Sequence, residues 1–497
     1  MSTEPLLPGL STKAVPGPAP DGMGTGLFAS TDIQLGDDVL YIKTPFVAVL
    51  DTPRLEDTCA GCFGKRMSPE GALADIELKA CTGCRVVRYC DKTCQSKDWR
   101  TAHSLECAIF QKLKPRILPN NARAVLRMVL RTERQKYKPQ ELDLFSQLET
   151  HIRDIREQNT KQWERISLSA TAVKVYAGTG MEEEIIASFF AKLDLNSFNL
   201  VNALYDRIGL YMHPYAALIN HSCEYNSVVG FDGDELHIKA IRPIKRGEQV
   251  FISYVDTTNP YQTRQIELAE RYFFDCQCSK CMKGTDSRED SFLSPPQDLS
   301  KLDVVERQAS ETIDSASTRT PSEAIATLES AIHTLHQTTI WPTTRQPYIS
   351  LRNELIASLL SAGRFNGAFI QAAIRYIYVD PVIFPQEIHP IRQLHAWALV
   401  KLAIHLSQGV EINTQDVSLE RYELNFGLII WSVLSGLVKN ETQSCGVPTF
   451  RKMVRESFND VYGQFRANGM DPESLGGLVK EEWEKLGGIC RRTLGME

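Results

Sequence analysis

The residues best suited to chemistry in this sequence lie between Asn220 and Cys281, where four cysteines share one stretch of chain. Cys223, Cys276, Cys278 and Cys281 supply the ligand type and number of a closed structural zinc site. The alternative is that Cys223 is a buried core thiol, but the other three thiolates would then leave one coordination position of zinc open. The sequence therefore predicts a zinc site that closes the chain between Cys223 and Cys276 into a loop.

A second group of metal-binding residues occupies positions 59–107, as two Cys-x2-Cys pairs, one Cys-x3-Cys pair and one His-x3-Cys pair. These seven thiols and one imidazole are the ligands of two tetrahedral zinc sites: Cys59, Cys62, Cys81, Cys84, Cys90, Cys94, His103 and Cys107. The pairs four residues apart suit one face of a helix, but spacing alone leaves open which pairs share an ion. Because the span has few aliphatic residues, we expect zinc binding to supply its folding energy.

The composition is that of an ordinary soluble protein, with 497 residues, 43% of them hydrophobic and 23% charged, enough for two to four domains. The longest apolar run, 426–438, is too short to cross a bilayer, and the N-terminus lacks the features of a secretory signal. Clustered cysteines in a reducing compartment indicate metal binding rather than disulfides. We therefore expect no membrane association and a location in the cytoplasm and nucleus.

The net charge of −6 conceals a basic region. Residues 59–138 contain 17 Lys and Arg against seven Asp and Glu. Such a region could contact nucleic acid weakly or bind an acidic partner, although a run of charge is as often a solvated face.

Several elements must position these residues. Residues 39–43 and 46–50 read as strands, and Asp232-Gly233-Asp234 is the turn signal of a hairpin. Residues 108–195 and 321–497 carry apolar positions at helical spacing, and 362–365 resemble the turn of a tetratricopeptide-type helix pair. The proline-rich residues 1–20 read as a flexible arm.

Three motifs carry a resemblance to a known family: Asn-His-Ser-Cys at 220–223, Gly-Glu-Gln-Val-x-Ile-Ser-Tyr at 247–254 and Cys-x-Cys-x-x-Cys at 276–281. In this order they resemble the C-terminal half of a SET domain, a fold that transfers methyl groups from S-adenosylmethionine to lysine. Residues 59–107, with Tyr89 and Trp99, resemble a MYND finger. In that family the pairs interleave, which implies Cys59, Cys62, Cys90 and Cys94 on one zinc ion and Cys81, Cys84, His103 and Cys107 on the other.

With the helical C-terminal region, the chain resembles the SMYD family of lysine methyltransferases along nearly its whole length. The fold class implied is α+β, with a β-rich SET domain, an inserted MYND finger and helices, and an all-α tetratricopeptide-like end. The implied organisation is a flexible arm (1–20), the first part of the SET domain (21–58), the MYND finger (59–107), a helical insertion (108–195), the second part of the SET domain (196–255), a post-SET zinc segment (256–284), a linker with a first helix (285–320) and the helical C-terminal domain (321–497).

The resemblance also implies site residues. The residues implied to bind S-adenosylmethionine are Met23, Gly24, Thr25, Asn196, Asn220, His221, Tyr254 and Phe274. Met23 replaces a basic residue of many relatives, so contacts there must come from the backbone. The Gly-x-Gly-x-Gly at 22–26 could by itself be a plain turn, and Asn196 could equally cap a helix.

Tyr254 is the implied catalytic residue, which orients the lysine amine through its hydroxyl, whereas the alternative is a tyrosine of a core strand. Tyr272, Phe273 and Phe274 are candidates for the wall of the lysine channel. An apolar channel favours the neutral amine that the reaction needs.

The function implied is an S-adenosylmethionine-dependent protein-lysine N-methyltransferase with three zinc ions, acting as a monomer on a histone or another protein and contributing to chromatin regulation. The competing hypothesis is an adaptor without enzymatic activity, in which the finger and the helical groove recruit proline-rich or acidic peptides. Tyr254 and the Asn220-His221 pair favour the enzyme.

Overall fold

The computed structural model describes residue 7 and residues 9–20, 22–66, 77–409 and 415–496. The chain forms two compact units. The first comprises Met1–Tyr254, Glu267–Cys276 and Val447–Phe450, and the second Val255–Ile266, Gln277–Gly446 and Arg451–Glu497.

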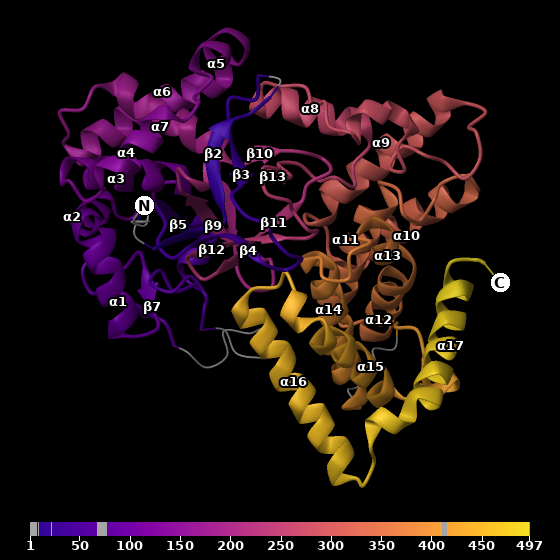
Figure 1. Ribbon diagram of the computed structural model, residues 1–497. Helices are drawn as coiled ribbons and strands as arrows, with labels where there is room; N and C mark the ends of the chain where they lie inside the picture. Colours follow the sequence, from indigo (N-terminus) through magenta and orange to yellow (C-terminus); the bar gives the residue numbers. More distant parts are fainter. Residues whose placement is uncertain (1–6, 8, 21, 67–76, 410–414, 497) are drawn as a thin grey trace. The chain divides into compact units, whose positions relative to one another are not determined.

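The first unit is built on three small sheets and a two-stranded hairpin (Figure 1). The first sheet has the order β1 (Leu10–Thr12), β4 (Asp38–Ile42), β12 (Glu235–Ala240), β11 (Ser227–Asp232). The second has the order β10 (Asn220–His221), β13 (Gln249–Ile252), β3 (Thr25–Ala29), β2 (Ala14–Pro18). The third has the order β5 (Val47–Leu50), β9 (Arg207–Met212), β8 (Phe198–Val201), and the hairpin is β6 (Lys79–Ala80) with β7 (Arg88–Tyr89).

The predicted strands and hairpin are present. β4 and β5 coincide with the strands expected at 39–43 and 46–50, and β11 and β12 pair antiparallel up to Asp232 and Glu235. Gly233 has a φ of 68°, which L side chains rarely adopt and which this tight turn requires.

The expectation that residues 1–20 form a flexible arm is wrong for 10–18. β1 and β2 pair with strands of the core, and the side chain of Ala14 is fully buried. Pro16 and Pro18 suggested disorder, but β2 is an edge strand, where proline is tolerated because one side of the strand needs no hydrogen-bond partner. Residues 1–6 and 8 lie outside the described residues.

The insertion expected to be helical at 108–195 is helical. Its helices are the end of α2 (Ser104–Leu113), α3 (Asn120–Glu133), α4 (Pro139–Gln147), α5 (Ile152–Gln158), α6 (Thr160–Ala177) and α7 (Glu183–Asn196). α3 packs against α6, α7 and strand β5 (Figure 1). This strand is the edge of its sheet, and α3 covers it.

Three arginines spaced four residues apart on α3 satisfy carbonyls of this edge. Arg123 donates to the Leu50 carbonyl at 2.7 Å, Arg127 to Ala48 at 2.8 Å, and Arg131 to Phe46 at 2.6 Å. Four helical residues rise about 6 Å and two strand residues about 6.6 Å, so the two repeats match. These three arginines are therefore structural, and the basic region predicted at 59–138 is smaller on the surface than the sequence suggested.

The second unit is helical, as expected for 285–497. Its helices are α9 (Leu299–Ala316), α10 (Pro321–Gln337), α11 (Tyr348–Ser361), α12 (Phe365–Ile374), α13 (Asp380–Ile383), α14 (Pro390–Ser407), α15 (Phe426–Lys439), most of α16 (Pro448–Ala467) and α17 (Gly476–Thr493). Neighbours in the chain pack together, as in α10 with α11, α11 with α12 and α14 with α15. The α11–α12 turn contains Gly363 at a φ of 68°, as a tight helix-pair connection requires. In the described part of the chain, no helix has the length and apolarity of a membrane span.

Candidate active site and zinc centres

The second sheet brings together the glycine turn at 22–26 and the SET-like motifs at 220–223 and 247–254. β10 pairs parallel with β13, with Asn220 opposite Phe251 and His221 opposite Ile252. β13 also pairs antiparallel with β3, whose preceding turn contains Gly24. Because β13 leads into Tyr254, segments nearly 200 residues apart in sequence meet at one end of this sheet.

Asn220 connects its own motif to the glycine turn at 22–26. Its amide nitrogen donates to the main-chain carbonyls of Met23 at 3.3 Å and Thr25 at 3.4 Å. A Cβ at Gly26 would lie 3.1 Å from this nitrogen and 2.4 Å from Nε2 of Gln249, so a larger residue there would displace both amides. A Cβ at Gly24 would meet no atom within 4 Å, which leaves space beside this turn.

The Gln249 amide is an unexplained polar group next to this turn. Its Nε2 atom is buried and has no hydrogen-bond partner among the described residues. A buried donor without a partner costs about 1–3 kcal/mol, so it is expected to meet an acceptor in the working protein. The donor, the carbonyls of the turn and the space beside Gly24 fit a small polar ligand.

Tyr254 is fixed at both its backbone and its hydroxyl. Its N–H donates to Nδ1 of His221 at 2.9 Å, and its hydroxyl donates to the Ile219 carbonyl at 2.6 Å. Burial raises the pKa of Tyr254 well above its usual value, and the nearby Tyr272 adds to the effect. The hydroxyl therefore stays protonated at neutral pH, with a defined direction.

His221 uses both ring nitrogens within the protein. Since Nδ1 accepts from Tyr254, a neutral ring carries its proton on Nε2, which lies 3.3 Å from Sγ of Cys223. His221 thus connects the backbone of Tyr254 to a predicted zinc ligand. A bound ligand would therefore contact His221 through the face of its ring or through its backbone. The sequence motif alone does not show which part of His221 is available.

The aromatic run 272–274 spreads over three partners. The ring of Tyr272 lies 4.8 Å from that of Tyr254, and the ring of Phe274 lies 5.9 Å from that of His221. Phe273 follows the last residue of α8 (Tyr261–Tyr272) and has a φ of 61°, a conformation that ends the helix and separates neighbouring side chains. Tyr272 therefore packs on the ring of Tyr254, whereas Phe274 packs on His221.

Phe273 has a different neighbour, which sequence reasoning missed. Its ring stacks on His151 at 4.8 Å with 23° between the ring planes, and His151 also has a positive φ of 46°. His151 lies in the α4–α5 connection, inside an insertion that the sequence marked only as helical. No local motif distinguishes it, because its role depends on a residue over 100 positions away.

Asn196 lies at the end of α7 and holds the same connection. Its side-chain nitrogen donates to the carbonyls of Lys192 at 2.9 Å and Glu149 at 3.3 Å. These contacts resemble neither simple helix capping nor a contact with the Asn220 motif. Its predicted role in cofactor binding stays a prediction.

The finger brings together its eight ligands in the two sets that the family resemblance implied. The first finger site consists of Cys59, Cys62, Cys90 and Cys94. The second finger site, also called the second zinc group, consists of Cys81, Cys84, His103 and Cys107. In each site all ligand atoms lie within 4.8 Å of one another.

Distances within the finger fit zinc. The sulfurs of Cys62 and Cys90 are 3.7 Å apart, and those of Cys81 and Cys107 are 3.8 Å apart. Tetrahedral ligands about 2.3 Å from zinc would be separated by about 3.8 Å. The N–H groups of Gly61 and Cys90 also point to Sγ of Cys59 at 3.4 and 3.3 Å, as a thiolate requires.

The elements of the finger position these ligands. Asp91 caps α1 (Lys92–Asp98) by accepting from the N–H of Cys94 at 2.8 Å, which places this cysteine in the first turn. A π-helical turn at Trp99–His103 joins α1 to α2. His103 and Cys107 are consequently on one face at this junction.

The third group is Cys223, Cys276, Cys278 and Cys281, with all sulfurs within 4.8 Å of one another. This is the four-thiolate set predicted from the sequence, so Cys223 is not merely a core thiol. Together the three groups fit three structural zinc ions.

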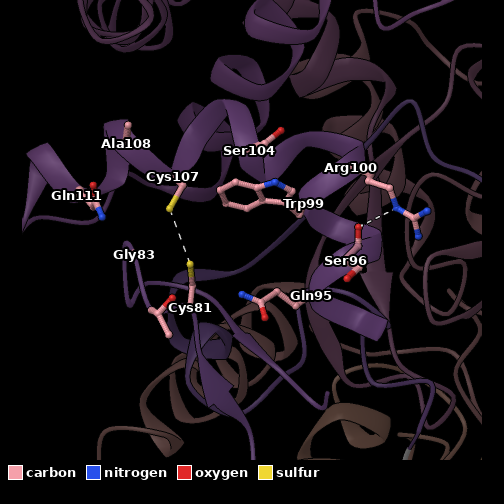
Figure 2. A pocket seen from close by; sticks show the side chains of 11 residues that line it. Cys81, Gly83, Gln95, Ser96, Trp99, Arg100, Ser104, Cys107, Ala108 and Gln111 are labelled. Atoms are coloured by element: carbon pink, nitrogen blue, oxygen red, sulfur yellow. Dashed lines mark hydrogen bonds between the residues drawn. The ribbon is translucent and has the colours of Figure 1, made fainter. Parts of the chain in front are cut away.

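A cavity of about 860 Å³ lies on the finger beside the second zinc group. Figure 2 shows the indole of Trp99 among polar side chains, with the Cys81–Cys107 pair on one side and Arg100 and Ser96 on another. Trp99 is 44% exposed, unusual for such a large apolar side chain.

Comparison with known proteins shows which proteins this chain is similar to. The SET domain profile matches residues 24–255. The SET domain and MYND-type zinc finger protein 6 of Schizosaccharomyces pombe is 29% identical over 267 residues, which cover 54% of this chain and 51% of that protein. The Histone-lysine N-methyltransferase SMYD3 of Mus musculus is 26% identical over 398 residues, which cover 77% of this chain and 86% of that protein.

Among solved structures, the SET domain of LSMT bound to lysine and AdoHcy aligns over 94% of this chain and 91% of that chain, at 15% identity and a TM-score of 0.26. A TM-score this low supports no conclusion about the two chains. This chain spans only about half the length of the S. pombe relative, 51%. The SET profile over residues 24–255, the two relatives and the two interleaved zinc groups point the same way: this chain is similar to the SET and MYND domain (SMYD) proteins.

Proposed function

We propose that this chain is an S-adenosylmethionine-dependent protein-lysine N-methyltransferase. The observation that carries the proposal is the convergence of the Gly24 turn, Asn220 and the fixed Tyr254 hydroxyl at one end of a single sheet. The cofactor supplies a methyl group activated on a sulfonium, and the protein has to bind it and orient the amine.

The Gly24 turn and Asn220 are the proposed cofactor cradle. The Asn220 amide fixes the carbonyls of Met23 and Thr25, so the backbone around Gly24 keeps its shape before a ligand arrives. The unpartnered Nε2 of Gln249 lies on the same side of Gly26 as Asn220 and can donate to a polar group of the ligand. A preformed cradle lowers the ordering cost of binding.

Tyr254 is the proposed orienting residue for the substrate amine. Its hydroxyl proton is directed at the Ile219 carbonyl, so its oxygen lone pairs are available to the incoming amine. The rings of Tyr272 and Tyr254 form apolar walls that disfavour the ammonium form of lysine. Alignment of the amine with the methyl group is a positioning effect worth several kcal/mol.

Calorimetry with S-adenosylmethionine tests the cradle. We expect the wild-type chain to bind and Asn220→Ala to bind at least about tenfold more weakly, since both carbonyl contacts are lost. Asn199→Ala, at the exposed position of β8, is the matched control and should bind as wild type does. Folded, zinc-loaded wild-type protein that does not bind the cofactor would favour the adaptor hypothesis.

We further propose that the cavity beside Trp99 binds a proline-rich peptide. Polyproline segments dock on aromatic-lined grooves, and Gln95, Ser104 and Gln111 provide polar groups beside the exposed indole for peptide carbonyls. An acidic peptide or a nucleic acid would instead bind through the surrounding lysines and arginines.

Fluorescence titration of the full chain with a proline-rich peptide, an acidic peptide and single-stranded DNA distinguishes these partners. Trp99→Ala removes the exposed indole. Because Trp99 contacts the ring of His103 at 5.8 Å, Gln95→Ala serves as a second variant that spares this zinc ligand. Proline-rich binding that both variants weaken supports the proposal. Binding of DNA alone, with a steep salt dependence, would contradict it.

A further inference from the structure

His103 has one ring nitrogen at the zinc site and one buried away from it. Nε2 lies 3.4 Å from Sγ of Cys81 and 3.6 Å from Sγ of Cys84, which makes it the ligand atom of the second finger site. Nδ1 is buried and has no hydrogen-bond partner in the described part of the chain. The nearest ionic group is the carboxylate of Glu106, with Oε2 at 3.9 Å.

Glu106 is an acidic residue in an unusual place. Its side chain is 1% exposed, and it lies one helical turn after His103 at the start of α2. A buried carboxylate is costly unless it is paired, and Arg127 on α3 supplies that pairing. Nε of Arg127 donates to Oε1 at 2.7 Å, and Nη2 donates to Oε2 at 2.9 Å.

Arg127 also reaches the SET domain. Its Nη1 donates to the Ala48 carbonyl of β5 at 2.8 Å, as the middle member of the three arginines that cover this strand. The same guanidinium lies 3.7 Å from Asp98, which accepts from the Tyr89 hydroxyl at 2.8 Å. One arginine therefore contacts two buried acids of the finger and a strand of the SET domain.

We propose that Glu106 accepts a hydrogen bond from Nδ1–H of His103 when zinc is bound, and that Arg127 holds Glu106 in place for this. Both are thus positioning residues of the second finger zinc. A histidine bound to zinc through Nε2 must carry its proton on Nδ1, and zinc-bound histidines almost always donate that proton to a carboxylate, a carbonyl or water. The carboxylate is about 1 Å beyond hydrogen-bond distance, a gap that a small rotation of either side chain closes.

The arrangement has a consequence for the whole first unit. Because Arg127 binds both Glu106 and β5, the shape of the second zinc site is fixed relative to the SET strands. Loss of this zinc is expected to loosen the Arg127 contact with Ala48, whereas loss of the first zinc is not. The two finger sites thus differ in how they are connected to the SET domain.

The test is Glu106→Gln in the full chain, with zinc release to a colorimetric chelator as the readout. Glutamine preserves size and packing but replaces a charged acceptor by a neutral one. We expect zinc affinity at the second finger site to fall about 10- to 100-fold, the usual effect of removing such a partner. The first finger site, with four cysteines, is the internal control and should keep its affinity.

Cobalt substitution identifies which site has changed. The second finger site has three sulfurs and one nitrogen, whereas the other two groups have four sulfurs, so their cobalt absorption bands differ. We expect Glu106→Gln to lose the three-sulfur signal at lower chelator concentration than wild type. Arg127→Met should act in the same direction, and the double variant should add little, because Arg127 acts through Glu106.

A purely structural role for Glu106 predicts something else: a lower melting temperature with unchanged zinc affinity in the folded protein. That result, or equal weakening of both finger sites, would overturn the proposal. If Glu106→Gln does not fold, Arg127→Lys serves instead, since lysine keeps the charge but offers a single donor group. Selective weakening of the three-sulfur site supports the proposal there too, and its absence contradicts it.

Discussion

Replacing Gly233 with alanine should disrupt the packing of the β11–β12 turn against the finger. A Cβ at this position would lie 2.5 Å from the carbonyl oxygen of Cys62 and 3.0 Å from Cβ of Lys65. Cys62 is a zinc ligand, so its backbone cannot move away without distorting the first zinc site. The neighbouring Asp234 also receives both hydrogen bonds of Lys97, at 2.6 and 2.7 Å, which anchors the turn.

The magnitude follows from two separate costs. Alanine at a φ of 68° costs about 1–2 kcal/mol relative to glycine. Overpacking against an immobile backbone adds about 1–3 kcal/mol. The free energy of unfolding of the first unit should therefore fall by about 2–5 kcal/mol.

Gly247→Ala is the matched control, because Gly247 has a φ of 86° and no atom within 4 Å of an added Cβ. It should lose only the conformational cost, about 1–2 kcal/mol. Thermal and urea unfolding in excess zinc would measure both, and chelator titration should show weaker zinc binding at the first finger site for Gly233→Ala alone. Equal destabilisation by the two variants, with equal zinc affinity at the first finger site, would mean that the turn does not pack closely against the finger.

Three further predictions concern the helical insertion, the zinc centres and Tyr254. Lys192→Met removes the ammonium group that donates to the carbonyls of Phe145 and Ser146 at 2.7 and 2.6 Å, so the free energy of unfolding in urea should fall by about 1–3 kcal/mol. S-adenosylmethionine should also bind more weakly, because the loop that places His151 on Phe273 loosens; unchanged affinity would show that this loop does not affect the site. Metal analysis of folded protein should return three zinc ions per chain, and a chelator should unfold the finger as judged by hydrogen exchange; two ions or fewer would refute the assignment of three sites. The methylation rate should rise with pH as the substrate lysine loses its proton. The rate should not fall again through ionisation of Tyr254, because burial raises the pKa of Tyr254; a fall in rate beginning near about pH 9 would contradict this.

The zinc centres were predictable because their information is local. The spacing of eleven cysteines and one histidine gave all twelve ligands, and the family resemblance gave the pairing within the finger, both as the structure has them. The two motifs at 220–223 and 247–254 also meet, through the hydrogen bond between His221 and Tyr254. Each of these signals needs only residues whose type and spacing are constrained by chemistry.

Other features depend on partners that are distant in sequence. In the sequence, Pro16 and Pro18 suggest a disordered arm. In the structure they lie on β2, which pairs with β3 and forms the edge of the sheet, where proline is tolerated. Arg123 and Arg131 look like surface charge until β5 lies alongside α3. The stacking of His151 on Phe273 has no sequence signature for the same reason.

The central claim is that Tyr254 orients a lysine amine for methyl transfer, and the most direct measurement is single-turnover transfer of labelled methyl from S-adenosylmethionine to lysine peptides. Wild type should transfer the label, and Tyr254→Phe should lose most of the transfer rate. The variant should retain its melting temperature and its affinity for the cofactor by calorimetry, since only the hydroxyl that contacts Ile219 is removed. Tyr211→Phe is the matched control, because its buried hydroxyl has no partner among the described residues, and it should react at the wild-type rate. Transfer by Tyr254→Phe at the wild-type rate, or none by cofactor-bound wild type, would contradict the account.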